Sequence, residues 1–204
     1  MDFRQIFFDL DDTLVNTRET IYKRIGILLE EFQLRTDPYK IYDLLDLKDR
    51  EERLKGLVKN PADFWERYEQ LRRIVRVSSI SGVIPTLEEL RSRNIPLGII
   101  TNNRHGKTLE KLTSAKINSR IFIGGIYSCS EIDFLKPSSE IAKIINLFPE
   151  KVLYVGDDLI DYEFAQNMGV DFYGVCTGFY GKEDFLKKGL GVERIFPNIR
   201  KAFK

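Results

Sequence analysis

The sequence predicts an α/β protein with a doubly wound parallel sheet as its core and a smaller, all-helical domain. Two observations predict this fold class. From about residue 80 onward, short apolar runs with polar ends alternate with helical patterns, as is typical of a parallel sheet covered by helices. By contrast, residues 16–77 keep helical spacing and contain no strand-like run. We therefore expect a core of residues 1–15 and 78–204, with residues 16–77 inserted after the first strand.

Five apolar runs are expected to form the strands, namely residues 5–8, 95–100, 121–123, 151–155 and 172–176. Continuous apolar runs suit strands that are buried on both faces. The first, second and fourth runs lead directly into polar segments, and the third leads towards Lys136. Ligands of doubly wound sheets bind at the carboxyl ends of the strands, so these polar ends mark the expected site.

Helices are expected wherever apolar residues recur at helical spacing. In the core these residues are Leu87 and Leu90, Leu109 and Leu112, Ile141 with Ile144 and Ile145, and Phe164 with Ala165 and Met168. In the inserted stretch they are Ile21, Ile25, Leu28, Leu29 and Phe32, and then Phe64, Trp65, Tyr68, Leu71, Ile74 and Val75. Pro38 and Pro61 are typical of a first helical turn, and residues 78–82 are the expected return hinge.

Composition and charge argue against several classes of partner. The 32 Lys and Arg residues balance 31 Asp and Glu residues, so no overall field would attract nucleic acid or an anionic membrane. No apolar run reaches the roughly 20 residues of a membrane span, and the N-terminus lacks the pattern of a signal peptide. We expect a cytoplasmic protein with neither nucleic acid nor a membrane as partner, in which a local pocket binds any anion.

Asp9 and Asp11 are two carboxylates that follow the first strand at positions i and i+2. Alternate residues point to the same side of a strand, so the two charges repel and something must offset that cost. A divalent cation would do so, and so would a division of roles between an ionised and a protonated carboxyl group. Asp157 adds a third carboxylate, and Asp161 follows one helical turn later. Hard oxygen ligands of this kind suit Mg²⁺.

Thr101 and Lys136 offer ways to hold an anion. Thr101 has a hydroxyl group, the backbone N–H groups of Asn102 and Asn103 could point outward at a helix start, and Lys136 supplies a point charge. Each has a plainer explanation, because Thr101 could simply cap the next helix and Lys136 could lie in solvent. Together with the aspartates, however, these groups are what phosphoryl transfer requires.

Four motifs resemble those of the haloacid dehalogenase (HAD) superfamily in residue type, order and spacing. The first is FFDLDDT at residues 7–13, the second ends in Thr101 and Asn102, the third is Lys136 with Pro137, and the fourth runs from Gly156 to Asp161. The resemblance implies a Rossmann-like core with a helical cap inserted after the first strand, and residues 16–77 would be that cap.

The resemblance also implies a role for each aspartate. Asp9 would attack phosphorus and bind Mg²⁺. Asp11 would protonate the leaving oxygen, later deprotonate water, and offer its backbone carbonyl to the metal, while Asp157 would ligate the metal directly. Asp161 and Asp158 would orient metal-bound water, although Asp158 is equally well explained as an acid favoured by a helix N-terminus.

By the same resemblance, Thr101, Asn102 and Lys136 would bind the phosphate of the substrate. Asp11 argues against the dehalogenases, which have another residue at this position, and against the transport ATPases, which have threonine there and are far larger. We therefore expect a Mg²⁺-dependent phosphatase that hydrolyses a small phosphorylated metabolite, a phosphomonoester, through phospho-Asp9. A phosphomutase that uses the same intermediate and a catalytically silent binding protein with this fold remain alternatives.

Overall fold

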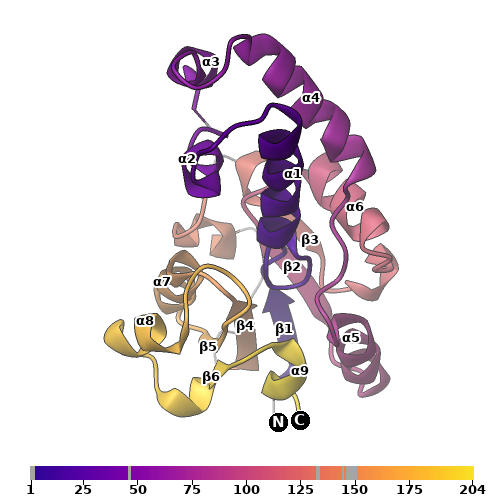
Figure 1. Ribbon diagram of the computed structural model, residues 1–204. Coiled ribbons are helices and arrows are strands. Elements are labelled where there is room, and N and C mark those ends of the chain that lie inside the picture. The colour runs from indigo at the N-terminus through magenta and orange to yellow at the C-terminus, as the bar shows by residue number, and fades with distance from the viewer. Residues whose placement is uncertain (1–2, 46, 132–133, 144, 146–150) are drawn as a thin grey trace. The chain divides into compact units, whose positions relative to one another are not determined.

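The computed structural model describes residues 3–45, 47–131, 134–143, 145 and 151–204. The chain forms two compact units (Figure 1), Met1–Asn16 with Ser78–Lys204, and Thr17–Val77. It passes between them twice, next to Asn16 and next to Ser78. These two residues are joined because the Asn16 N–H donates to the Ser78 carbonyl at 3.0 Å and the Ser78 N–H donates to Asn16 Oδ1 at 2.8 Å. The two chain crossings are thus held side by side at the edge of the first unit.

The first unit is built on a six-stranded parallel sheet, which confirms the predicted fold class. Its strands are β1 (Gln5–Phe8), β2 (Leu97–Thr101), β3 (Ile126–Ser128), β4 (Val152–Gly156), β5 (Asp171–Val175) and β6 (Ile195–Phe196). Their order in the sheet is β3-β2-β1-β4-β5-β6, and all described pairings are parallel. Because β1 lies between β2 and β4, the residues that follow these three strands meet at one edge of the sheet.

The helices of the first unit are α5 (Val83–Ser92), α6 (His105–Ser114), α7 (Leu159–Met168), α8 (Lys182–Lys187) and α9 (Ile199–Ala202). Leu87, Leu90, Leu112 and Phe164 are buried, so the helical spacing of the sequence correctly identified the inward faces of α5, α6 and α7. Tyr154 in β4 packs edge-on against Phe164 and beside Phe172 of β5. Aromatic packing of this kind fixes α7 against the central strands.

The predicted strand at residues 121–123 is wrong. Residues Ser119–Ile121 form a 3₁₀ turn, η1, and the strand begins only at Ile126, after Gly125 with a φ of 100°. Ile123 is 74% exposed, so it cannot belong to a strand that is buried on both faces. Ile121 and Phe122 are nevertheless buried, and their turn packs against α5 and α6. The helical pattern at Ile141 also differs, since Ser139–Lys143 is a 3₁₀ helix, η3, and Ile144 lies outside the described residues.

The second unit has its own apolar core, formed by α1 (Thr17–Glu31), α2 (Pro38–Tyr42), α3 (Arg50–Leu54) and α4 (Pro61–Ile74). Its fully buried residues include Ile25, Leu28, Ile41, Leu54 and Phe64. The two prolines open their helices as expected, and Asp37 caps α2 by accepting the Tyr39 N–H at 2.9 Å. A separate core of this kind explains why the unit is compact by itself.

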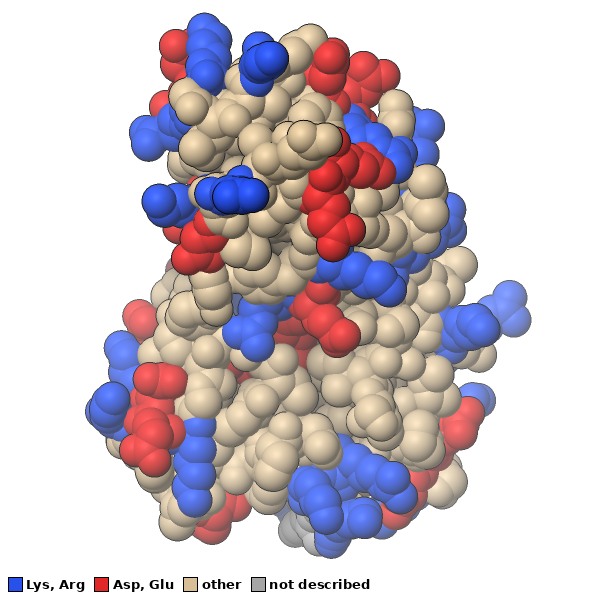
Figure 2. Space-filling model, in the orientation of Figure 1, with Lys and Arg blue, Asp and Glu red and all other residues tan. Residues whose placement is uncertain are grey.

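Charges of both signs are interspersed over the visible faces of the two units (Figure 2). This mixture agrees with the near balance of 32 basic and 31 acidic residues. None of the helices in the described part of the chain combines the length and the apolar character that crossing a bilayer requires.

Arg24 is a buried cation that holds the second unit together. It is 8% exposed, and its Nε and Nη2 atoms both donate to the carbonyl of Val75 at 2.9 and 2.7 Å. Val75 is the residue that ends α4, so this fork ties α1 to the end of α4, just before the chain leaves the unit.

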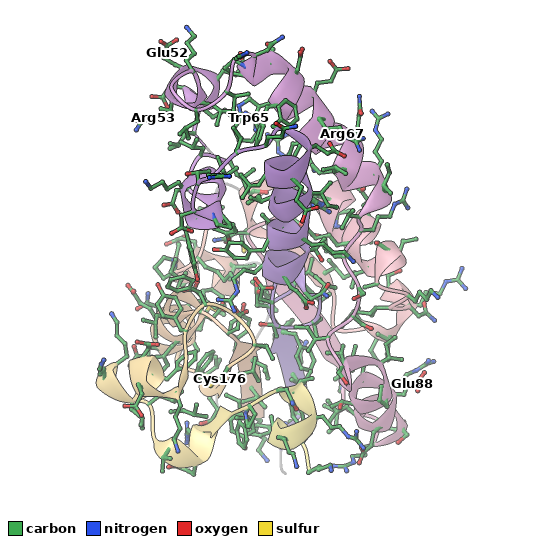
Figure 3. The ribbon with its side chains drawn as sticks, in the orientation of Figure 1. Glu52, Arg53, Trp65, Arg67, Glu88 and Cys176 are labelled. Carbon is green, nitrogen blue, oxygen red and sulfur yellow. The ribbon has the colours of Figure 1, made fainter. Side chains whose placement is uncertain are left out.

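We predict that Arg24→Met lowers the free energy of unfolding of the helical unit by about 1–3 kcal/mol, because it leaves the Val75 carbonyl without its donor. The single tryptophan, Trp65, is buried in this unit (Figure 3), so its fluorescence during urea denaturation reports the change. Arg53→Met is the matched control, since Arg53 is 57% exposed and pairs only with Asp49 among the partners described for it. Equal effects of the two substitutions would contradict the assignment.

Candidate active site

The loop after β1 contains a turn that is fixed by backbone hydrogen bonds. The turn is made at Asp12, whose φ is 55°, in the left-handed region that aspartate tolerates better than most residues. The Asp9 N–H donates to the Val155 carbonyl at 2.9 Å, and the Asp12 N–H donates to the Val15 carbonyl at 2.7 Å. These bonds fix the backbone of the loop, so Asp9 and Thr13 are held in buried positions.

A cavity of about 290 Å³ opens at this edge of the sheet. All eight residues predicted from the sequence as site residues line it, namely Asp9, Asp11, Thr101, Asn102, Lys136, Asp157, Asp158 and Asp161. Asp12, Asn103 and Ile160 complete the described lining. Six carboxylates therefore face one small space, and the structure must compensate for their mutual repulsion.

The ammonium group of Lys136 provides the central compensation. It donates to Asp9 Oδ1 at 2.6 Å, to Asp161 Oδ1 at 2.5 Å and to the Tyr154 hydroxyl at 3.0 Å. The Tyr154 hydroxyl donates in turn to the Ile100 carbonyl at 2.9 Å. Although burial acts to lower it, the charges of Asp161 and Asp9 raise the pKa of Lys136 well above its ordinary value. Lys136 is thus buried among its partners and is not a solvated surface lysine.

The carboxyl groups of Asp9 and Asp157 are strained electrostatically. Burial raises the pKa of Asp9 to about 7, and the charges of Asp161 and Asp11 add to this while Lys136 opposes it. Burial also raises the pKa of Asp157, and so do the charges of Asp9 and Asp161. The Thr13 hydroxyl, which donates to Asp157 Oδ1 at 2.6 Å, works in the opposite direction.

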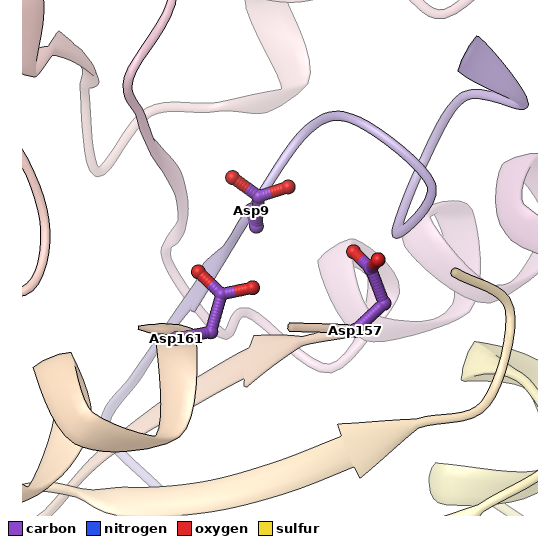
Figure 4. Close-up of side chains that lie close together, drawn as sticks. All are labelled: Asp9, Asp157 and Asp161. Carbon is purple, nitrogen blue, oxygen red and sulfur yellow. The ribbon is translucent and has the colours of Figure 1, made fainter. Parts of the chain in front are cut away.

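The carboxylates of Asp9, Asp157 and Asp161 converge (Figure 4), and one oxygen of each lies within 4.8 Å of the others. A divalent cation among hard oxygen atoms would relieve their repulsion, so these residues fit Mg²⁺. Both oxygens of Asp161 already accept protein hydrogen bonds, from Lys136 and from the Asp158 N–H at 3.2 Å. Asp9 and Asp157 therefore suit direct metal ligands, and Asp161 suits an outer position.

The loop after β2 connects to the other loops of the site. Asn102 Oδ1 accepts the backbone N–H of Lys136 at 2.8 Å, so this side chain joins two of the predicted motifs. Thr101 Oγ1 accepts the Asn103 side-chain N–H at 3.0 Å and the Asn103 backbone N–H at 3.3 Å. Thr101 does not cap the next helix, because the N-cap of α6 is Arg104.

Asp158 lies at a helix N-terminus, which was the alternative explanation that the sequence offered for it. It is the N-cap of α7, and its Oδ1 accepts the Ile160 N–H at 2.8 Å. Asp161 completes a capping box by accepting the Asp158 N–H. The fourth motif thus starts a helix and also places Asp161 against Lys136.

Asp11 differs from Asp9 in its surroundings. Its side chain is 30% exposed, and Lys111 Nζ donates to its Oδ1 and Oδ2 atoms at 2.5 and 2.7 Å. Asn103 Nδ2 donates to Asp11 Oδ2 at 2.5 Å. Lys111 was not predicted as a site residue, because it lies in the last turn of α6 and follows no strand end.

Two glycines make room for the carboxylates of the site. A Cβ atom at Gly178 would lie 1.7 Å from Asp157 Oδ2, and one at Gly156 would lie 2.4 Å from Asp161 Oδ2. Only glycine lets the backbone approach so closely. Gly178 and Thr13 were also missed by the sequence analysis. Thr13 could have been found from its place in the first motif, whereas Gly178 lies in a loop without a comparable signal.

Comparison with known proteins identifies the family of the chain. Residues 6–175 match the model of the family described as haloacid dehalogenase-like hydrolase. A pyrophosphatase, PpaX, of Bacillus cereus (strain Q1) is 26% identical over 197 residues, with 89% of this chain and 87% of the relative covered. PpaX of Bacillus mycoides (strain KBAB4) is 24% identical over 192 residues, with the same coverage.

Among solved structures, a HAD family hydrolase of Deinococcus radiodurans R1 with bound phosphate and sodium has a TM-score of 0.79 at 22% identity, with 98% of this chain and 92% of that chain covered. A candidate β-phosphoglucomutase of Thermotoga maritima also has a TM-score of 0.79, at 20% identity and with 98% and 96% covered. The chain belongs to the haloacid dehalogenase-like hydrolases. The predicted membership and the predicted enzyme class, a phosphatase-type hydrolase, are confirmed.

We predict that Gly178→Ala removes Mg²⁺ binding and lowers activity by about 100-fold or more, because the new methyl group displaces the Asp157 carboxylate. Thermal unfolding with and without Mg²⁺ measures the binding directly. Gly106→Ala is the matched control, since a Cβ atom there meets nothing within 4 Å. Retention of the Mg²⁺-induced shift by Gly178→Ala would refute the proposed close contact.

We also predict that Asp9→Asn stabilises the metal-free protein at pH 8. Burial raises the pKa of Asp9 from 3.8 to about 7, so the folded protein prefers the protonated form of this carboxyl group. The contribution of Asp9 to the free energy of unfolding is therefore fully present below pH ~4 and is lost as the pH rises through about 7. The rise corresponds to at most roughly 4 kcal/mol. In EDTA, the Tm of Asp9→Asn relative to wild type should therefore increase by several degrees between pH 4.5 and pH 8. A difference that does not change with pH would disprove this account.

Proposed function

We propose that this hydrolase is a Mg²⁺-dependent phosphatase that cleaves a small phosphomonoester through a phosphorylated Asp9. The observation that carries the proposal is the contrast between two carboxylates of one loop. Asp9 is buried against Lys136 at 2.6 Å, as suits a nucleophile fixed in one orientation. Asp11 is partly exposed at the same cavity, where an acid can exchange protons with substrate and water.

In the first step, a carboxylate oxygen of Asp9 forms a bond to phosphorus as the bond from phosphorus to the ester oxygen breaks. Asp11, in its protonated form, gives its proton to the departing oxygen, so that the product leaves as a neutral alcohol. Lys136 keeps its protons and holds Asp9 in position. Thr101 and Lys136 are proposed to bind the phosphoryl oxygens, with the loop at Asn102 supplying backbone N–H groups.

In the second step, Asp11 takes a proton from a water molecule while the water oxygen attacks phosphorus. The bond between Asp9 and phosphorus then breaks, inorganic phosphate leaves, and both carboxyl groups return to their starting states. Asp9, Asp157 and the backbone carbonyl of Asp11 are proposed to hold Mg²⁺, with Asp161 and Asp158 in outer positions. When bound, this ion supplies positive charge that offsets the negative charge of the phosphoryl group.

The helical unit, Thr17–Val77, is proposed to be the cap that selects the substrate. It interrupts the chain directly after the loop that contains Asp9, Asp11 and Thr13, so a movement of this unit would be transmitted to that loop. Its two connections lie together at Asn16 and Ser78, as suits a hinge.

A phosphomutase is the second candidate function. Such an enzyme uses the same phosphorylated aspartate and returns the phosphoryl group to a second oxygen of the sugar, and one structural relative is a candidate β-phosphoglucomutase. The curated relatives are named pyrophosphatases, so inorganic diphosphate belongs among the compounds to be tested. A silent binding protein is disfavoured because each predicted catalytic aspartate is present.

We predict Mg²⁺-dependent release of inorganic phosphate by the wild type and a loss of at least about 1,000-fold in Asp9→Asn, which keeps the shape but removes the nucleophile. The panel comprises sugar phosphates, phosphoglycolate, nucleoside monophosphates and diphosphate. Fluoroberyllate with Mg²⁺, which mimics a phosphorylated aspartate, should raise the Tm of wild type only.

Each other outcome has a distinct meaning. Transfer of phosphate within a sugar, without release, would identify a mutase. Absence of turnover together with absence of a fluoroberyllate shift would support the binding protein. Full activity of Asp9→Asn would overturn the proposed mechanism.

A further inference from the structure

Lys111 is a cation that contacts the site from a helix and not from a loop. It lies in the last turn of α6, its side chain is 12% exposed, and its Nζ donates to both carboxylate oxygens of Asp11 at 2.5 and 2.7 Å. The same Nζ lies 3.3 Å from Asn103 Oδ1 and donates to it. The neighbouring Leu112 is fully buried, so this turn of the helix is anchored and the position of Lys111 is well defined.

Asn103 extends this contact into a network. Its side-chain oxygen accepts from Lys111, and its Nδ2 donates to Asp11 Oδ2 at 2.5 Å and to Thr101 Oγ1 at 3.0 Å. The network therefore joins α6, the loop after β1 and the end of β2. These contacts restrict the rotamer of Asp11, a partly exposed carboxylate on a loop.

The residues that line the cavity include Asp11 and Asn103 but not Lys111. Lys111 therefore reaches the chemistry through Asp11 and not by touching a ligand in the cavity. This separates it from Lys136, which lines the cavity and contacts Asp9 and Asp161. The two lysines hold different carboxylates, one for each chemical role in the loop after β1.

We propose that Lys111 is a positioning residue for proton transfer by Asp11, an inference that rests on the function proposed above. Lys111 and Asn103 fix the plane of the Asp11 carboxyl group, so that one of its oxygens faces the ester oxygen of the substrate. The proton moves from Asp11 to the departing oxygen and is later replaced by a proton from water. Lys111 itself gains and loses none.

The inference predicts an effect that depends on the leaving group. A basic leaving oxygen needs a proton from Asp11 as its bond breaks, whereas p-nitrophenolate needs this far less. We expect Lys111→Gln to lower kcat/KM for phenyl phosphate by about 100-fold. For p-nitrophenyl phosphate we expect a loss of about tenfold or less. The parameter kcat/KM is the suitable one because it reports the step that transfers phosphate to Asp9.

A double-mutant cycle tests whether Lys111 acts through Asp11. Once Asp11→Asn has removed the acid, adding Lys111→Gln should cause no further loss for either ester. Lys111→Arg keeps the cation and should recover part of the activity. Lys116→Gln, which removes one charge from an exposed residue just after the same helix, should behave as wild type.

The outcomes separate the two proposals. Equal losses for both esters, or losses in Lys111→Gln and Asp11→Asn that multiply in the double variant, would overturn the role of Lys111 and leave the phosphatase intact. A wild type that releases no phosphate from any ester, or an Asp9→Asn variant with full activity, would instead remove the proposed function on which this inference rests.

Discussion

The buried ammonium group of Lys136 is the interaction on which the site depends. The side chain of Lys136 is 5% exposed, and its Nζ atom lies within hydrogen-bonding distance of Asp9, Asp161 and Tyr154. Removing Lys136 would leave the carboxylates of Asp9 and Asp161 buried without their counter-charge, which is far more costly than losing an exposed pair. The three donor positions of Lys136 also reach β4, the loop after β1 and the first turn of α7. A single charge therefore sets the relative positions of three segments that are distant in the sequence.

The remaining excess of negative charge explains why the site suits a cation. Burial and mutual repulsion raise the pKa values of Asp9 and Asp157 even though Lys136 and Thr13 oppose the rise. Repulsion among these carboxylates destabilises the folded protein when no cation is bound. A cation that binds there removes the repulsion and so stabilises the folded state. The six carboxylates all lie in the first unit, whereas the helical unit has an apolar core of its own.

The parts of the fold and site that follow strand ends could be predicted from the sequence. Asp9, Thr101 and Asp157 each come directly after a buried apolar run, and in a parallel sheet that position alone brings them to one edge. Lys111 and Tyr154 could not be found this way. Lys111 contacts Asp11 only because α6 packs where it does, and Tyr154 looks like any core aromatic until its hydroxyl is seen between Lys136 and Ile100. The third strand was misplaced for a related reason, since the buried apolar residues 121 and 122 belong to a turn that packs against α5 and α6 and not to a strand.

Asp9 and Asp11 are chemically identical and two residues apart, so their proposed roles must come from their surroundings. Asp9 is buried directly after β1, whereas Asp11 is partly exposed and contacts Lys111 of α6. Asp9 then faces Lys136 and the other carboxylates, whereas Asp11 faces Lys111 and Asn103. Two like carboxylates with different burial and different partners are what a nucleophile and a proton carrier require. The loop after β1 thus places two like side chains in two different environments.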